Sequence, residues 1–219
     1  MKRTLSYAAV LSLAAAACLS SAIPASGATH AQQASARYGA NAVRFNMVRS
    51  TGAQKAACIP DARGLVTVVP NDLNDLMSVQ VAGLPPNTDF DLFVTQLPDA
   101  PFGVSWYQSD LHTNSYGYGS VTVRGIFDVE TFSLSLGGPA GGSDPTQGLT
   151  SPAVVDTNVV MRPTHQYHLG LWFNSPDDAA RANCGATVTP FNGEQHAGIQ
   201  ALSTRNFPAA QGPLSQIHR

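Results

Sequence analysis

Residues 79–94 read VQVAGLPPNTDFDLFV, and this segment is the clearest indication of the fold class. Apolar side chains stand at every second position on both sides of a central PPNT sequence. An apolar period of two is typical of a half-buried strand, while the two prolines fix φ and Asn87 and Thr88 favour a turn. The stretch therefore predicts two strands joined at a tight corner, with Leu84 and Phe90 both entering the core.

The same alternation recurs along the chain and predicts an all-β, antiparallel domain. It is clearest in residues 43–48, 77–82, 131–136 and 167–173, with shorter candidates at 65–69, 104–106, 121–123, 154–161 and 187–189. Repeated half-buried strands separated by Gly, Pro, Asn and Asp clusters favour two packed antiparallel sheets or a barrel. We expect the former, a β-sandwich over residues 43–206, followed by a C-terminal tail at 207–219.

One segment carries the signals of a helix. Residues 175–182 read SPDDAARA, in which Ser175 can cap the N-terminus and Pro176 suits the first turn. The two aspartates that follow favour the positive end of a helix. We therefore expect one short helix near 176–182, which would bring Cys184 towards its partner. Residues 137–148 are rich in glycine and are expected to form a long loop.

The corner at 79–94 resembles one found in fibronectin type III and related immunoglobulin-like sandwiches. In that family a strand ends at Gly-Leu, a proline-rich turn follows, and an aromatic residue opens the next strand. The resemblance implies an immunoglobulin-like sandwich and implies nothing about activity. The family usually has a tyrosine whose hydroxyl bonds back to the corner, and Phe90 cannot make that bond.

The N-terminal 28 residues have the three regions of a secretory signal peptide. Lys2 and Arg3 form a basic start, residues 5–19 are apolar but too short to span a bilayer comfortably, and Ser26-Gly27-Ala28 suits cleavage. We therefore expect an exported protein that is secreted or associated with the cell envelope. The scarcity of Lys beside abundant Ala, Gly and Pro suggests a bacterial source.

Cleavage after Ala28 would remove Cys18 and leave Cys58 and Cys184. An even pair of cysteines in an exported chain predicts one disulfide. The competing interpretation is a metal or reactive thiol site, although neither cysteine has a histidine or basic residue beside it in the sequence. Lipid anchoring at Cys18 is an alternative to cleavage after Ala28. We expect residues 29–42, which are small and polar, to form a flexible leader.

The mature chain would be mildly acidic. Cleavage removes two of the 12 basic residues, Lys2 and Arg3, which leaves 10 against 14 acids and a formal net charge of −4. Nucleic acid is not an expected partner, because no basic stripe is present to neutralise phosphates. The mature sequence also has no apolar run long enough to cross a membrane, and we expect no cofactor.

No catalytic signature is recognisable in the sequence. A Gly-x-Ser-x-Gly elbow is missing, and the glycine-rich loop has neither the lysine nor the following helix that phosphate binding needs. Asp89 and Asp91 are expected on the solvent face of their strand. An alternative is a metal-assisted hydrolase that uses the internal histidines His112, His165, His168 and His196.

Residues 102–119 combine aromatic residues with polar ones and are the best candidate for ligand contact. Flat rings beside amide and carboxylate groups suit polar ligands such as glycans or peptides. The candidate ligand-binding residues are Trp106, Tyr107, Asp110, His112, Tyr116 and Tyr118. In the competing interpretation, Trp106 and Tyr107 pack on the two faces of a strand while the other two tyrosines brace a turn.

The sequence thus predicts an exported, non-catalytic binding or envelope-associated module for a glycan, peptide or cell-surface ligand. The alternatives are the metal-assisted hydrolase and a structural protein of the cell surface or coat. No enzyme class is favoured by the residues.

Overall fold

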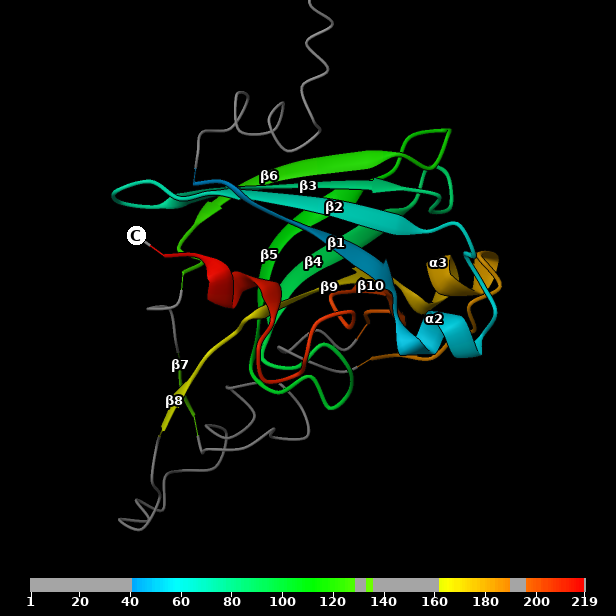
Figure 1. Ribbon diagram of the computed structural model, residues 1–219. Coiled ribbons are helices and arrows are strands. Elements are labelled where there is room, and N and C mark those ends of the chain that lie inside the picture. Colours follow the sequence, from blue (N-terminus) through cyan, green and yellow to red (C-terminus); the bar gives the residue numbers. More distant parts are fainter. Residues whose placement is uncertain (1–40, 129–132, 136–161, 190–195, 219) are drawn as a thin grey trace, which may run out of the picture.

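The computed structural model describes residues 41–128, 133–135, 162–189 and 196–218. Their main feature is an eight-stranded antiparallel sheet with the strand order β5-β4-β9-β10-β1-β2-β3-β6 (Figure 1). The signal peptide and the strand expected at 154–161 lie outside the described residues. The strands of the sheet are β1 Val43–Arg49, β2 Arg63–Val69, β3 Asp75–Ala82, β4 Asp89–Thr95, β5 Ser105–His112, β6 Gly119–Gly125, β9 His168–Phe173 and β10 Gln200–Ser203.

The sheet curls into a nearly closed, barrel-like form. Strand β1 changes partner along its length, since residues 43–47 pair with β2 whereas Val48 and Arg49 pair with β10. The two end strands, β5 and β6, are consecutive in the chain and meet in a hairpin at the isolated bridge between Thr113 and Gly119. The all-β prediction is confirmed, but the immunoglobulin-like sandwich is not, because one continuous order of strands replaces two separate sheets.

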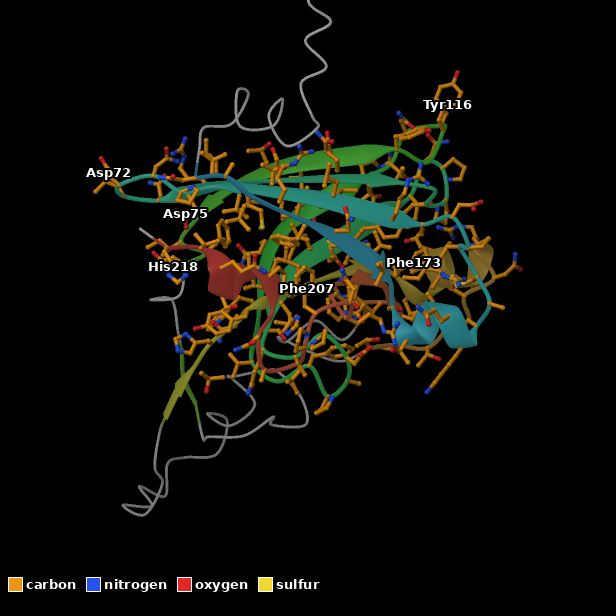
Figure 2. All side chains as sticks on the ribbon, viewed as in Figure 1. Asp72, Asp75, Tyr116, Phe173, Phe207 and His218 are labelled. Atoms are coloured by element: carbon orange, nitrogen blue, oxygen red, sulfur yellow. A yellow bond between two sulfur atoms is a disulfide. The ribbon has the colours of Figure 1, made fainter. Side chains whose placement is uncertain are left out.

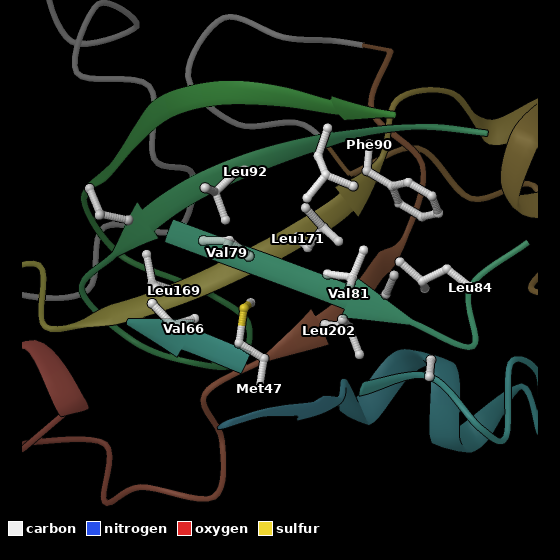
Figure 3. Packing of buried hydrophobic residues seen from close by; sticks show 14 of the residues in the cluster. Met47, Val66, Val79, Val81, Leu84, Phe90, Leu92, Leu169, Leu171 and Leu202 are labelled. Atoms are coloured by element: carbon white, nitrogen blue, oxygen red, sulfur yellow. The ribbon is translucent and has the colours of Figure 1, made fainter. Parts of the chain in front are cut away.

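The inward faces of these strands enclose the apolar core (Figure 3). The period of two predicted this face correctly on β1, β3, β4 and β9. Side chains that meet in the interior include Met47, Val66, Val79, Val81, Leu84, Phe90, Leu92, Leu169, Leu171 and Leu202. Truncating a fully buried leucine such as Leu92 to alanine would cost about 2–5 kcal/mol of stability.

Two short helices lie at the end of the sheet, and the disulfide joins the segments that follow them. The expected helix is α3, Pro176–Arg181, and the Ser175 hydroxyl accepts a hydrogen bond from Asp178 N as its cap. No helix was predicted at α2, Thr51–Lys55, which is only one turn long and is capped by Ser50. The predicted disulfide between Cys58 and Cys184 is present and closes a sequence separation of 126 residues.

The C-terminal segment packs against the sheet. Leu214, in the short 3-10 helix η1 Pro213–Gln216, is buried in the core together with Ile217. Phe207 packs edge-on against Phe45, with ring centroids 6.1 Å apart. Residues 207–218, which we expected to be a tail, therefore contribute directly to the core.

Two further expectations concern strands outside the main sheet. Part of the segment at 131–136 forms β7, Ser133–Ser135, which pairs with β8, Arg162–Thr164, in a separate two-stranded ladder. Residues 187–189 lie in the described part of the chain and are not in a strand.

Candidate ligand-binding surface

Residues 105–119 of the segment that we singled out for ligand contact form a strand and a hairpin turn. Its first part is β5, which pairs with β4 from Asp89 to Thr95. The register shifts between Leu92 and Phe93, so that one residue of β5 bulges. Trp106 and Tyr107 are consecutive and lie on opposite faces of β5, and each keeps 46% of its surface exposed.

Asn114 organises the turn that follows β5. Its side-chain Oδ1 accepts hydrogen bonds from the backbone N–H groups of Tyr116, at 2.9 Å, and Tyr118, at 3.1 Å. The backbone of Asn114 closes the same turn, since its N–H donates to Tyr118 O at 2.8 Å. Tyr116 stands out into solvent at this end of the molecule with 81% of its surface exposed, and Tyr118 is 55% exposed (Figure 2).

The proline-rich corner is hydrogen-bonded to the hairpin. The Thr113 hydroxyl donates to Pro85 O at 2.6 Å, and Thr88 N donates to the same hydroxyl oxygen at 3.0 Å. Asn87 N donates to Asn114 O at 3.1 Å. The proline-rich corner therefore also fixes the position of the aromatic turn.

Gly117 is required where the turn touches the corner. Its φ of 72° lies in the left-handed region, and a Cβ atom added there would lie 2.1 Å from Leu84 O. Only glycine adopts this φ without strain and leaves room for Leu84 O. The turn can therefore lie in close contact with the corner.

A shallow, solvent-open hollow of about 490 Å³ lies beside the turn. Strand β3, the end of β5 and the start of β6 contribute its walls. The lining residues are Gln80, Val81, His112, Asn114, Tyr118, Gly119 and Ser120. Two of the six candidate ligand-binding residues, His112 and Tyr118, thus meet in one site, and Tyr116 lies in the same turn.

His112 is held in place by Asp89. The His112 Nδ1 and Asp89 Oδ1 atoms are 2.6 Å apart, and both side chains remain more than half exposed. Because an ionised carboxylate can only accept, Nδ1 carries the proton of this hydrogen bond. In the neutral imidazole, Nε2 is then left as an acceptor.

Tyr107 and Asp110 form a second contact farther along the same face of β5. The Tyr107 hydroxyl donates to Asp110 Oδ1 at 2.8 Å, and the Tyr107 ring packs edge-on against Phe93 at 5.6 Å. Partial burial and the neighbouring Asp110 carboxylate raise the pKa of Tyr107 to about 12. Because Asp110 and His112 are two residues apart, these side chains form one row that leads to the hollow.

Asp91 is buried, contrary to the expectation that it faces solvent. Only 4% of its surface is exposed. The outward face of β4 and β9 carries a second apolar cluster, in which Trp172 packs edge-on against Phe93 at 5.6 Å and Phe102 at 5.0 Å. The connection between β4 and β5 brings Phe102 onto the sheet, so alternation within the strand does not reveal this covering layer.

His112 and His168, two of the four internal histidines, lie far apart. His168 lies opposite Thr95 and His112 opposite Asp89, and six residues along β4 correspond to about 20 Å. His165 stacks on Tyr167 with ring centroids 4.7 Å apart. Within the described residues, no three His, Cys, Asp or Glu side chains form a group that could hold a metal ion.

His168 is fully buried beneath the C-terminal segment. Its Nδ1 lies 2.9 Å from the Thr204 hydroxyl, and its Nε2 lies 3.2 Å from Ala209 O. Burial lowers the pKa of His168 from 6.5, and hydrogen bonds with the surrounding backbone oppose that shift only in part. His168 thus joins the sheet to the residues that follow β10.

Comparisons with known proteins do not assign a function to this surface. No family model, curated protein or solved structure matches the chain. Among the described residues, every helix is too short or too polar to span a membrane.

Proposed function

We propose that the chain is an exported, non-catalytic binding module whose ligand site is the β5–β6 hairpin and the hollow beside it. The observation that carries this proposal is the Asn114-ordered turn, which keeps Tyr116 and Tyr118 exposed although their backbone is fixed. Large aromatic side chains held in solvent by an ordered backbone lose little conformational entropy when a ligand covers them. This arrangement favours recognition.

The row of polar residues on β5 extends the proposed site. Tyr107, Asp110 and His112 share a face that ends at the hollow, so a ligand longer than the hollow could lie along the strand. Trp106 lies on the opposite face and is the one candidate that belongs neither to this row nor to the turn.

Array binding tests this proposal. The mature protein should bind a ligand on a combined glycan and peptide array, and Tyr118→Ala should remove most of that binding. The Trp106→Ala, Tyr107→Ala double variant separates the contribution of the two β5 aromatic residues from that of the turn. Leu73→Ala is the matched control, because Leu73 is also exposed and follows Asp72 at the opposite end of the molecule from Tyr116 (Figure 2). Binding that none of the aromatic substitutions weakens would refute the proposed site.

The proposed export rests on the N-terminal sequence and is supported by the disulfide. Disulfides persist in oxidising compartments outside the cytosol. Mass spectrometry of the protein from its natural host should show a chain that begins at Thr29 with Cys58 and Cys184 oxidised. A lipidated chain beginning at Cys18 would exclude free secretion, and retention of residues 1–28 would contradict export.

We also propose that the 79–94 corner is related to that of the immunoglobulin-like sandwiches. Leu84 and Phe90 are buried on either side of the prolines, as the resemblance implies. The Thr113 hydroxyl bonds to Pro85 O at the corner, where the family usually uses a tyrosine hydroxyl. An experimental structure with either apolar side chain outside the core would contradict this relationship.

A further inference from the structure

We propose that the hollow beside Tyr118 binds a neutral carbohydrate, an inference that rests on the proposed binding function and specifies its ligand. The hollow offers a balanced set of uncharged hydrogen-bond donors and acceptors next to an aromatic ring. Sugar hydroxyls both donate and accept, and the C–H groups of a sugar ring can lie against an aromatic face.

Asn114 supplies donors whose direction is fixed. Its Oδ1 accepts from the backbone N–H groups of Tyr116 and Tyr118, and a backbone N–H can only donate. The orientation of the Asn114 amide is therefore determined by its neighbours. Its NH₂ group, which makes no hydrogen bond within the described chain, is left to donate to a ligand.

Gln80 and Ser120 provide the opposite wall. Gln80 on β3 pairs with Ser120 on β6, and both side chains are exposed. Neither side chain makes a hydrogen bond to another described residue. Together they offer a carbonyl acceptor, an NH₂ donor and a hydroxyl that can do either.

His112 adds an acceptor of defined type. Its Nδ1 is engaged by Asp89, so the Nε2 of the neutral ring can accept a hydrogen bond from a sugar hydroxyl. The hollow thus combines two amides, a hydroxyl and an oriented imidazole. These groups suit neighbouring hydroxyls on one sugar ring.

The charges around the hollow disfavour an anionic ligand. None of its lining residues is Lys or Arg, and the lining residue His112 is bonded to the carboxylate of Asp89. On the neighbouring strand β2, Arg63 donates to Asp61 O at 3.1 Å and is not part of the lining, and on β6 the Arg124 guanidinium is bonded to Asn74 at 2.6 Å, about 17 Å along the strand from Gly119. A phosphate, sulfate or carboxylate group on the ligand would therefore find no cation in the hollow.

A peptide fits the hollow less well than a sugar does. Peptide-binding sites offer either an unpaired strand edge or pockets for alternate side chains. Here β3 is paired with β2 on one side and β6 on the other, and β5 and β6 reach the hollow only at His112, Gly119 and Ser120, beside the bridge between Thr113 and Gly119 where their edges meet. Tyr118 and Val81 are the only large apolar residues in the lining, which leaves no apolar pocket for an anchoring side chain.

An array of neutral glycans, acidic glycans and peptides tests the ligand class. We expect the mature protein to bind neutral glycans, with titration calorimetry giving the affinity for the best of them. Tyr118→Ala should weaken that affinity on the order of tenfold through loss of the ring. Asn114→Asp should weaken it by about tenfold as well, because it retains the acceptor for the two backbone N–H groups but removes the NH₂ donor.

Controls make each result decisive. Thermal unfolding and far-ultraviolet circular dichroism should show that Asn114→Asp remains folded, and Leu73→Ala should bind as the unaltered protein does. Tyr118-dependent binding to a peptide or an acidic glycan would overturn the inference of a neutral carbohydrate ligand but would still support a binding site at the hairpin. Neutral-glycan binding that survives both Tyr118→Ala and Asn114→Asp, or no binding to any array member, would overturn the inference and the proposed site together.

Discussion

Cys58 and Cys184 occupy equivalent positions at the ends of two different helices. Each cysteine follows a residue with a positive φ, Ala57 or Asn183, after the last turn of α2 or α3. Each also donates its backbone N–H to a carbonyl five residues earlier, at 3.2 Å for Cys58 and 2.8 Å for Cys184. The disulfide therefore joins two matched helix ends that are far apart in sequence.

Removing the disulfide should destabilise the protein strongly. Closing a separation of 126 residues restricts the unfolded chain, and the chain-entropy relation gives about 4–5 kcal/mol. The Cys58→Ala, Cys184→Ala double variant should show this loss in urea unfolding. An unfolding free energy equal to that of the oxidised protein would contradict the expectation.

Substitutions at the two helix ends should change the unfolding free energy in opposite directions. Ala57 has a φ of 53°, which costs an L-residue about 1 kcal/mol, so Ala57→Gly should raise the unfolding free energy by roughly that amount. Asn183 has a φ of 58°, which asparagine tolerates better than alanine, so Asn183→Ala should lower stability. Thermal unfolding of both variants gives the signs. A loss of stability in Ala57→Gly would argue against a strained helix end.

Acid should weaken the attachment of the C-terminal segment through His168. The pKa of His168 is lowered in the folded state because the ring is buried, so the unfolded chain binds the proton more tightly. Its contribution to stability is present above about pH 6.5 and is lost as the pH falls below that value. The charge that acts on His168 is that of Asp99, whose Oδ1 lies 3.8 Å from Arg205 Nε.

Urea unfolding at about pH 7.5 and about pH 5 measures this dependence. The difference in stability between the unaltered protein and His168→Gln isolates the imidazole from other titrating groups. We expect the unaltered protein to lose more stability on acidification than the variant. Equal losses in both proteins would contradict the role of His168.

Tyr107 should lose its hydroxyl proton at a higher pH than an ordinary tyrosine, because it is partly buried and lies beside Asp110. Its pKa is raised to about 12 by partial burial and then by Asp110. Asp110→Asn removes the negative charge and should bring the pKa of Tyr107 closer to 10.0. Alkaline titration followed by NMR of labelled tyrosine, with Tyr107→Phe to assign the signal, measures the change. If the pKa of Tyr107 is the same in Asp110→Asn as in the unaltered protein, Asp110 does not contribute to raising it.

The sequence predicted the parts of this protein that depend on local signals. Alternation identified most strands, and Ser175 with Pro176 marked α3. It did not identify the full length of β5, because SWYQSDLH mixes polar and aromatic residues and contains the bulge. The buried outward face of β4 was also missed, since Phe102 reaches it from a connection whose path depends on tertiary structure.

The candidate site was predicted only in part, for a similar reason. The aromatic and polar composition of residues 102–119 drew attention to Tyr118 and His112. Gln80 lies more than thirty positions earlier and joins them only because β3 pairs with β6. Strand pairing over such a separation leaves no pattern in a single sequence.

The location of ligand binding is tested most directly by NMR. The backbone and side-chain amide signals of the mature protein should be followed while the best neutral glycan from the array is added. We predict that the shifts concentrate in residues 112–120 and include the side-chain NH₂ signals of Asn114 and Gln80. Shifts confined to other parts of the sheet, or none at saturating glycan, would contradict a carbohydrate site at this hairpin.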